Sequence, residues 1–342
     1  MMEAITGEYL QRKSGFEPPW ETVYFGGGTP SVMEPHFIGK LMNLFHENGG
    51  LAPNAEITLE ANPEDITDRN MTAWLSAGIN RLSIGVQSLN DQTLALMNRK
   101  HSSLQSVDAV RKSLDAGFQS VNIDLIFGGF HFSMQEWQNT LDWAFECGAN
   151  HISAYGLTVE PLTRLQKQIT KGQIPIPMED EMAEAYEYLF SRAMNEGWDF
   201  YEISNLSKPG CRAKHNSNYW QGKPYLGLGP SAHSFNGKNR RCWNVSDNSK
   251  YIKQVLEKRL EPEEEILEKN DLYNEWVMTS LRKAEGLNRC DAENLIPGIW
   301  DKSRSSFEKW QQQGFLLYNE NNLALTLKGR LFADAITADL ML

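Results

Sequence analysis

Polar and glycine residues stand at the carboxyl ends of several short apolar segments, which is where parallel sheets and barrels build their sites. Three glycines and a threonine, Gly26 to Thr29, follow the segment TVYF. The later segments end in, or carry near their ends, the polar residues Glu60, Asn62, Gln87, Asp124, Tyr155 and Thr158. So many polar residues at one expected edge indicate a binding site.

These residue types suit a small zwitterionic ligand. Consecutive glycines let a ligand approach the backbone and hydrogen-bond to its N–H and C=O groups. The carboxylates of Glu60 and Asp124 can accept hydrogen bonds from hydroxyls or bind a cation. Arg99, 12 residues after Gln87, can bind a carboxylate through its planar guanidinium group. The pattern predicts a ligand with an amine, a carboxylate and a ribose.

Each of these residues, taken alone, also has a structural interpretation. The glycines can form a tight turn, the two carboxylates can cap neighbouring helices, and Gln87 can hydrogen-bond to backbone groups.

The elements that position these residues alternate between apolar strands and amphipathic helices from Trp20 to about Leu206. The expected strands span 22–25, 56–61, 81–87, 120–128, 151–158 and 200–204. The expected helices span 2–12, 35–48, 68–77, 104–116, 134–147 and 179–196, with Gly49 as a left-handed stop after the second. Near-continuous apolar strands of this kind are typical of parallel sheets covered on both sides. The fold class is therefore α/β, with six β/α steps.

After about residue 206, the composition and the expected secondary structure of the chain change twice. Residues 208–249 are rich in Gly, Asn and Ser and predict a long loop region. Helices are then expected over 271–283, 303–313 and 327–340, with a short hairpin before the last, an order that indicates a winged-helix type of domain. The predicted domains are 1–206, 207–260 (a connecting region) and 261–342.

Composition limits the class of protein. Among 342 residues, 41% are hydrophobic and 11% aromatic, enough for a sizeable core. A net charge of -11 disfavours nucleic acid as a partner. Four cysteines lie 31 to 64 residues apart, and no signal peptide or 18-residue apolar run is present, so we expect a soluble cytoplasmic protein with reduced thiols and no transmembrane segment.

A family resemblance rests on seven motifs in order along the chain: YFGGGTPS, ITLEANPE, RLSIGVQS, NIDLIFG, HISAYGLTVEP, HNSNYW and YLGLGPSAHS. With them, the sequence resembles the HemW-type heme chaperones from about residue 3 to the C-terminus. These are radical-SAM proteins allied to oxygen-independent coproporphyrinogen III oxidase. The resemblance implies a radical-SAM (β/α)6 partial TIM barrel followed by the winged-helix-like domain.

The resemblance also implies cofactors and partners. It implies binding of S-adenosylmethionine (SAM) and of heme, with delivery of heme to an acceptor protein; a homodimer is left open. Carried over by motif, the SAM contacts are Gly27, Gly28, Thr29, Glu60, Gln87, Arg99, Asp124 and Thr158.

The HNSNYW motif provides the candidate heme residues. His215 is a candidate axial ligand and Tyr219 an aromatic cover for the porphyrin. In the alternative, His215 and Asn216 hydrogen-bond a loop.

Radical-SAM chemistry needs a [4Fe-4S] cluster held by C-x-x-x-C-x-x-C, and this sequence contains no such motif. We therefore assign no metal ligands and expect no SAM cleavage by this chain. The motif and the first barrel strand are expected to precede Met1 in a longer form of the protein. The alternative is a natural relative that has lost the cluster.

Two functions other than that of a heme chaperone are compatible with parts of the sequence. One is coproporphyrinogen III oxidase, which needs the cluster and a longer N-terminal segment. The other is a winged-helix nucleic-acid binder. Its recognition helix would carry Lys302, Arg304 and Lys309 against Asp301 and Glu308, too little positive charge to bind phosphates.

Overall fold

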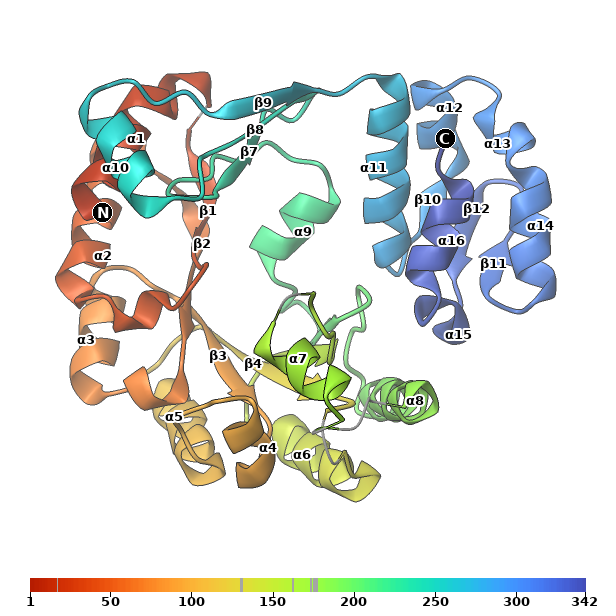
Figure 1. The fold of residues 1–342 in the computed structure, drawn as a ribbon, viewed down its shortest axis with the longest axis horizontal. Coiled ribbons are helices and arrows are strands. Elements are labelled where there is room, and N and C mark those ends of the chain that lie inside the picture. The colour runs from red at the N-terminus through yellow and green to blue at the C-terminus, as the bar shows by residue number, and fades with distance from the viewer. Residues whose placement is uncertain (17, 130–131, 162, 173, 175–177) are drawn as a thin grey trace. The chain divides into compact units, whose positions relative to one another are not determined.

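The computed structural model describes residues 1–16, 18–129, 132–161, 163–172, 174 and 178–342 (Figure 1). These residues form two compact units, each assembled from separate stretches of chain. One, which we call the sheet unit, contains Thr22–Gly39 and Glu56–Ala213. The other, the mixed unit, contains Met1–Glu21, Lys40–Ala55 and Lys214–Leu342. The domain boundaries expected at 206 and 260 stay a prediction.

The main sheet has six strands in the order in which they occur along the chain. They are β1 (Trp20–Phe25), β2 (Leu51–Ala61), β3 (Arg81–Gln87), β4 (Ser120–Phe127), β5 (His151–Gly156) and β6 (Asn205–Ser207). Strands β2 to β5 pair in parallel, and β6 pairs antiparallel with β5. All seven residues of β3 are buried, as expected of a strand covered on both faces.

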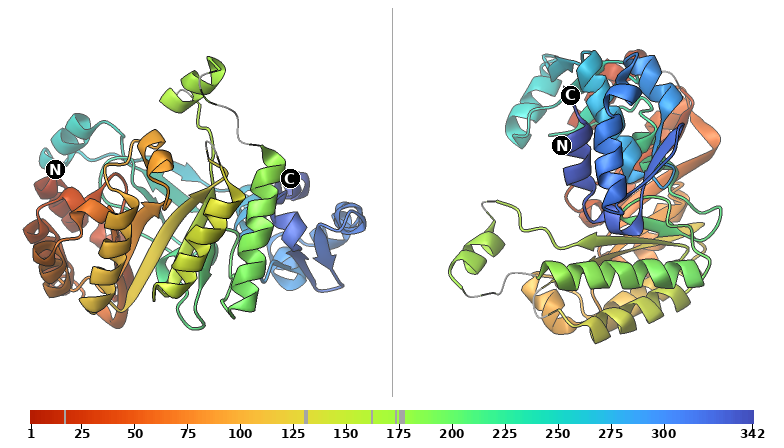
Figure 2. Two further views of the ribbon diagram at one scale, coloured as in Figure 1. Left: turned by 90° about the horizontal axis from the view of Figure 1, so that it is seen from below. Right: turned by 90° about the vertical axis from the view of Figure 1, so that its right-hand side faces the viewer.

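Helices cover one face of this sheet. Figure 2 shows α5 (Ser103–Asp115), α6 (Met134–Glu146) and α8 (Glu179–Asn195) side by side against it. The other helices before residue 200 are α1 (Met2–Arg12), α2 (Pro35–Glu47), α3 (Asp68–Ser76), α4 (Asp91–Leu96) and α7 (Arg164–Thr170). Side-chain caps fix several helix starts; Ser102 and Gln105 form a full capping box at α5. Gly49 ends α2 with a φ of +124°, as predicted.

The strand expected over 200–204 is wrong, because that segment is irregular, with a single bridge residue at Glu202 and a bend at residues 203–204. The buried carboxylate of Glu202 accepts hydrogen bonds from the Ser204 backbone N–H (2.8 Å) and the Asn205 side-chain amide (2.6 Å). These bonds curl the chain, so pairing with β5 starts only at Asn205.

The segment 208–249 is more ordered than the predicted loop region. It contains α9 (Lys214–Trp220), the antiparallel pair β7 (His233–Phe235) and β8 (Arg240–Trp243), and the start of α10 (Asn248–Leu256). Strand β9 (Glu263–Ile266) extends this pair to a three-stranded sheet. The prediction failed because these strands are only three or four residues long, too short for a periodic pattern to show.

The C-terminal part is helical with a small antiparallel sheet, consistent with the predicted winged-helix type. It contains α11 (Lys269–Arg282), β10 (Leu287–Asn288), α12 (Arg289–Leu295), α13 (Ile299–Lys302), α14 (Arg304–Gln312), β11 (Leu316–Tyr318) and β12 (Asn322–Leu325). The helix expected over 327–340 is two helices, α15 (Leu327–Arg330) and α16 (Ala333–Leu340). The break between them places the Phe332 ring against Phe315, with centroids 4.6 Å apart.

A buried carboxylate holds helix α1 within the mixed unit. Glu8 is fully buried and accepts hydrogen bonds from the Gly229 backbone N–H (2.8 Å), the Asn244 amide (2.6 Å) and the Tyr251 hydroxyl (2.6 Å). The Arg12 guanidinium lies 2.6 Å from the same carboxylate. These bonds tie α1 to a segment more than 200 residues away in the sequence.

We expect Glu8→Ala to lower the free energy of unfolding by about 3 kcal/mol, because it removes the carboxylate partner of the largely buried Arg12 and leaves several buried donors without their acceptor. Glu3→Ala, which removes an exposed carboxylate from the first turn of the same helix, should cost less than about 1 kcal/mol. Urea unfolding of both variants measures the difference, and equal losses would contradict the role given to Glu8.

Candidate functional site

The candidate SAM residues all belong to the sheet unit, and all but Asp124, which lies within β4, stand at or just beyond the carboxyl ends of its strands or in the loops that follow. Gly27 and Gly28 follow β1 with φ angles of +76° and +81°, a backbone conformation that other residues rarely adopt. The backbone N–H of Gly27 points to the carboxylate of Glu60 on β2, at 3.3 Å. The structure therefore brings the glycine loop and Glu60 together. Thr29 follows in the same loop.

A tyrosine that the sequence analysis missed completes the surroundings of Glu60. The Tyr24 hydroxyl on β1 donates to Glu60 Oε1 at 2.7 Å. Burial, together with the charge of Glu60, raises the pKa of Tyr24 far above its usual value, so this hydroxyl keeps its proton and remains a donor. A hydroxyl one residue before the end of an apolar strand was the available sequence signal.

Gln87 and Arg99 converge over a glycine. Gln87 ends β3 with a φ of +67°, unusual for a residue with a side chain, at an irregularity in the pairing of β3 with β4. A Cβ atom on Gly85 would lie 2.8 Å from Gln87 Nε2 and 3.9 Å from Arg99 Nη1, so glycine leaves room for both groups. Arg99 also approaches Asn62 Oδ1, at 3.4 Å.

The loop that carries Arg99 is fixed by a buried histidine. His101 is 4% exposed; its Nδ1 lies 3.2 Å from Glu64 Oε2 and its Nε2 3.3 Å from the Val86 carbonyl oxygen. These contacts connect the loop to the segments after β2 and at the end of β3.

Asp124 lies on β4 with a raised pKa of about 6, mainly because burial disfavours its charged form and secondly because Glu60 is also negative. The pKa of Asp124 is lowered by the positive charge of Arg81 and by hydrogen bonds from Ser83 and Asn122. Ser83 Oγ donates to both carboxylate oxygens at 3.2 Å, and Asn122 Nδ2 donates to Oδ1 at 2.7 Å. Glu60 and Asp124 thus make an acidic centre suited to a cation or to hydroxyl groups.

Thr158 is the exception among the predicted residues. It lies two residues beyond β5, where its hydroxyl donates to the Gly156 carbonyl at 3.5 Å. No contact within the described part of the chain connects it with the other candidates.

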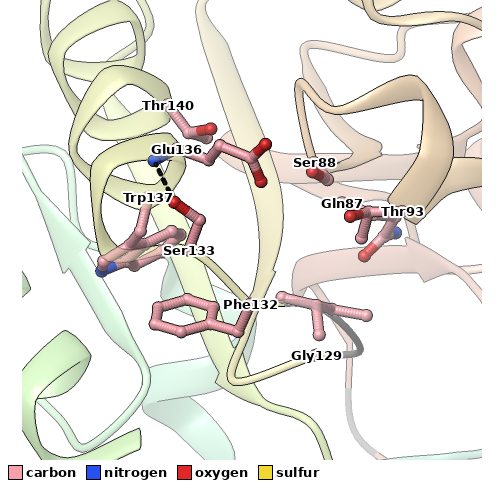
Figure 3. A pocket seen from close by; sticks show the side chains of 10 residues that line it. Gln87, Ser88, Thr93, Gly129, Phe132, Ser133, Glu136, Trp137 and Thr140 are labelled. Carbon is pink, nitrogen blue, oxygen red and sulfur yellow. Dashed lines mark hydrogen bonds between the residues drawn. The ribbon is translucent and has the colours of Figure 1, made fainter. Parts of the chain in front are cut away.

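A small cavity adjoins Gln87, between the end of β3 and the start of α6 (Figure 3). Its volume is about 30 Å³, room for little more than one water molecule. It is lined by Gln87, Ser88, Thr93, Ile126, Gly129, Phe132, Ser133, Glu136, Trp137 and Thr140. A cavity of this size does not hold an adenosyl group.

The candidate heme residues lie in the mixed unit, on α9. His215 and Tyr219 are one turn apart, with ring centroids at 5.0 Å and an edge-on contact. Tyr219 also contacts the Tyr225 ring at 4.6 Å and remains 39% exposed. Burial of the hydroxyl raises the pKa of Tyr219 to about 12, so this phenol is neutral at physiological pH. A histidine beside two aromatic rings suits a planar aromatic ligand.

The cysteines do not come together as ligands of an iron-sulfur cluster. Cys147 ends α6, Cys211 precedes α9, Cys242 lies on β8 and Cys290 on α12, and all four are free thiols. Throughout the described residues, no group of three His, Cys, Asp or Glu side chains is placed to hold a metal ion. The residues of this chain therefore do not fit a [4Fe-4S] cluster. Nor is any helix in the described ranges both long and apolar enough to cross a membrane.

The comparisons with known proteins place this chain in the radical-SAM class. The sequence profile of the Radical SAM superfamily matches residues 7–144. The coproporphyrinogen III oxidase HemN of Escherichia coli, described as a radical SAM enzyme, superposes on 99% of this chain and 82% of its own with a TM-score of 0.84. At 23% identity, this likeness shows the fold.

Sequence relatives identify the family within that class. The heme chaperone HemW of Mycobacterium tuberculosis is 34% identical over 326 residues, which cover 95% of this chain and 81% of the relative. A mitochondrial radical S-adenosyl methionine domain-containing protein 1 from Bos taurus is 31% identical over 354 residues, covering 98% and 79%. This chain belongs to the HemW family of heme chaperones.

We expect Asp124→Asn to stabilise the protein at pH 8 by up to about 3 kcal/mol, because the raised pKa makes ionisation of this half-buried carboxyl unfavourable in the folded state. Between the unfolded value near 3.8 and the folded value near 6, the folded protein binds more protons, so wild-type stability falls as pH rises through this window.

Urea unfolding of wild type and variant from pH 3.5 to 8 measures this effect. The stability difference should shrink as the pH falls from 6 towards 3.8 and level off below the unfolded value, where the aspartate becomes protonated in both states. A difference that is independent of pH would contradict the assignment.

Proposed function

We propose that this chain is a heme chaperone that binds heme as its cargo, binds SAM at the acidic centre of the sheet unit, and passes heme to an acceptor protein. The observation that carries the proposal is 34% identity, over 95% of the chain, to a relative named as a heme chaperone. The acceptor protein, a cytoplasmic location and the absence of nucleic-acid binding stay predictions.

The acidic centre suits SAM by its chemistry. SAM supplies a sulfonium cation, a ribose with two hydroxyls, and the amine and carboxylate of methionine. Glu60 and Asp124 would accept from hydroxyls or attract the positive charge, Arg99 would bind the carboxylate, and the glycine loop would offer backbone groups. The cluster has no part in this proposal, since the residues of this chain do not fit one.

The aromatic group on and beside α9 suits heme. His215 would bind the iron through an imidazole nitrogen, while Tyr219 and Tyr225 would contact the porphyrin. Exposure of Tyr219 at 39% leaves part of its ring accessible to a large planar molecule. A cargo that must be released is better held at an accessible surface than in a closed cavity.

We expect hemin added to the protein to give a shifted Soret band, and His215→Ala to alter that band, because replacing an axial imidazole changes the ligand field of the iron directly. The matched control is His46→Ala, which removes an exposed histidine at the end of α2 and should leave the band unchanged. An optical titration measures both.

An unchanged Soret band in His215→Ala would show that this histidine is not a ligand of the heme iron. If the protein did not bind hemin but bound duplex DNA at micromolar concentration in a salt-sensitive way, nucleic-acid binding would become the better interpretation of its function. The net charge of -11 disfavours that outcome.

We expect Glu60→Gln to weaken binding of radiolabelled SAM at least tenfold in equilibrium dialysis, because the change removes a charge that hydroxyls and a sulfonium would both face. Glu47→Gln, at an exposed position at the end of α2, is the control with the same chemical change. Equal affinities of the two variants would contradict the placement of SAM at this centre.

A further inference from the structure

A row of buried polar side chains runs across the sheet next to Asp124. Ser83 on β3, Asn122 on β4, and His151 and Ser153 on β5 are each 5% exposed or less. Strand register makes them neighbours, since Ser83 pairs with Asn122 and Asn122 with His151. Polar groups enclosed in this way must satisfy one another.

The direction of hydrogen-bond donation along this row is set at the end farthest from Asp124. The Tyr201 hydroxyl oxygen accepts the backbone N–H of Ala213, so its own proton is available to His151 Nε2, 2.7 Å away. Burial lowers the pKa of His151 well below its usual value, so the ring is neutral and carries one proton. With Nε2 accepting, that proton is on Nδ1, which donates to Asn122 Oδ1 at 2.5 Å.

The same logic fixes the orientation of the Asn122 amide. Its oxygen is used by His151, so its nitrogen faces Asp124 Oδ1 and Ser83 Oγ, each at 2.7 Å. A flipped amide would place oxygen against carboxylate at one end and N–H against N–H at the other. Three successive donors, from Tyr201, His151 and Asn122, therefore all point towards Asp124.

We propose that Asn122 and His151 are positioning residues, which hold the Asp124 carboxylate ionised and oriented for its ligand at the rim of the sheet. The inference rests on the proposed function in one respect, that the ligand is SAM. Neither residue touches the ligand: Asn122 acts on Asp124 directly, and His151 acts by fixing the amide of Asn122.

Other groups face Asp124 from every neighbouring strand. Glu60 on β2 opposes its ionisation, and Arg81 on β3 favours it. Tyr24 on β1 and Tyr155 on β5 also lie within electrostatic range, and both are neutral because burial raises their pKa values. With two carboxylates against one guanidinium, ionisation of Asp124 depends on the neutral donors Ser83 and Asn122.

The first test is a pH titration of the Asp124 carboxyl by ¹³C NMR, with the signal assigned by its loss in Asp124→Asn. Asn122→Leu should move the titration midpoint up by about one pH unit or more, a tenfold change in the acid constant, because it removes the closest donor. Asn150→Leu is the matched control: Asn150 bonds Ser120 and Val121 between the same strands, and its loss should leave the midpoint unchanged. An unchanged midpoint in Asn122→Leu overturns the proposal.

A second measurement needs no change to the buried amide, in case Asn122→Leu does not fold. The ¹⁵N shifts of His151 in the wild type should show the Nδ1–H tautomer, neutral from pH 5 to 8. Tyr201→Phe removes the donor to Nε2 and should populate the Nε2–H tautomer, with a smaller rise in the Asp124 midpoint. An Nε2–H tautomer in the wild type would overturn the direction of the chain of donors.

SAM binding separates this inference from the proposed function. Affinity measured against pH should fall below the Asp124 midpoint in the wild type and at a correspondingly higher pH in Asn122→Leu. If SAM does not bind the wild type at any pH, the proposed function fails, while the NMR titrations, which contain no ligand, still decide the role of Asn122. If SAM binds both proteins with the same pH dependence, the positioning role fails and the proposed function stands.

Discussion

A carboxylate enclosed between strands has to be met by hydrogen-bond donors, and this requirement organises the interior of the sheet unit. Asp124 takes donors from Ser83 and Asn122. Asn122 turns its amide nitrogen towards Asp124 because its oxygen faces His151 Nδ1, 2.5 Å away. In the arrangement proposed above, His151 carries its proton on Nδ1 because Tyr201 donates to Nε2. A chain of neutral groups thus supports one charge at the rim, where solvation by water is reduced.

The same rule acts in the mixed unit with a different result. Glu8 is more completely buried than Asp124, and its oxygens are filled by backbone, amide, phenol and guanidinium donors. All the hydrogen bonds that Glu8 accepts come from the protein itself, so this carboxylate has a structural role and connects helix α1 to the rest of the mixed unit. Asp124, half-buried and opposed by Glu60, is held at a cost in stability that a structural carboxylate does not carry.

Each candidate site is built within one unit of the fold. The acidic centre uses the ends of strands β1 to β4, a rigid frame in which each strand contributes one or two polar groups. The aromatic group uses a short helix, α9, and a loop residue, Tyr225. A small molecule with many polar groups suits the first arrangement, and a planar molecule held for transfer suits the second.

Hydrophobic periodicity, capping residues and glycines in the sequence determined strands β1 to β5 of the main sheet and most of their helices, but not β6. The segment 81–87 forms β3 as expected, and most other predicted boundaries from β1 to α8 lie within one or two residues of the observed ones. These are local properties: apolar runs, capping side chains and a glycine after the helix. The motifs also determined the family, now confirmed by relatives over most of the chain. The rim residues could be named from the sequence because the ends of parallel strands share one edge.

Only the tertiary structure decided which groups those rim residues contact. Tyr24 meets Glu60, Asn122 meets Asp124, and His151 meets Asn122 across 36, 2 and 29 residues of sequence. Asn122 and Asp124 share a face by the two-residue repeat of a strand, a signal present in the sequence. The contacts with Tyr24 and His151 depend on which strands are neighbours and in what register. Both are set by packing of the whole sheet, which no local stretch of sequence encodes.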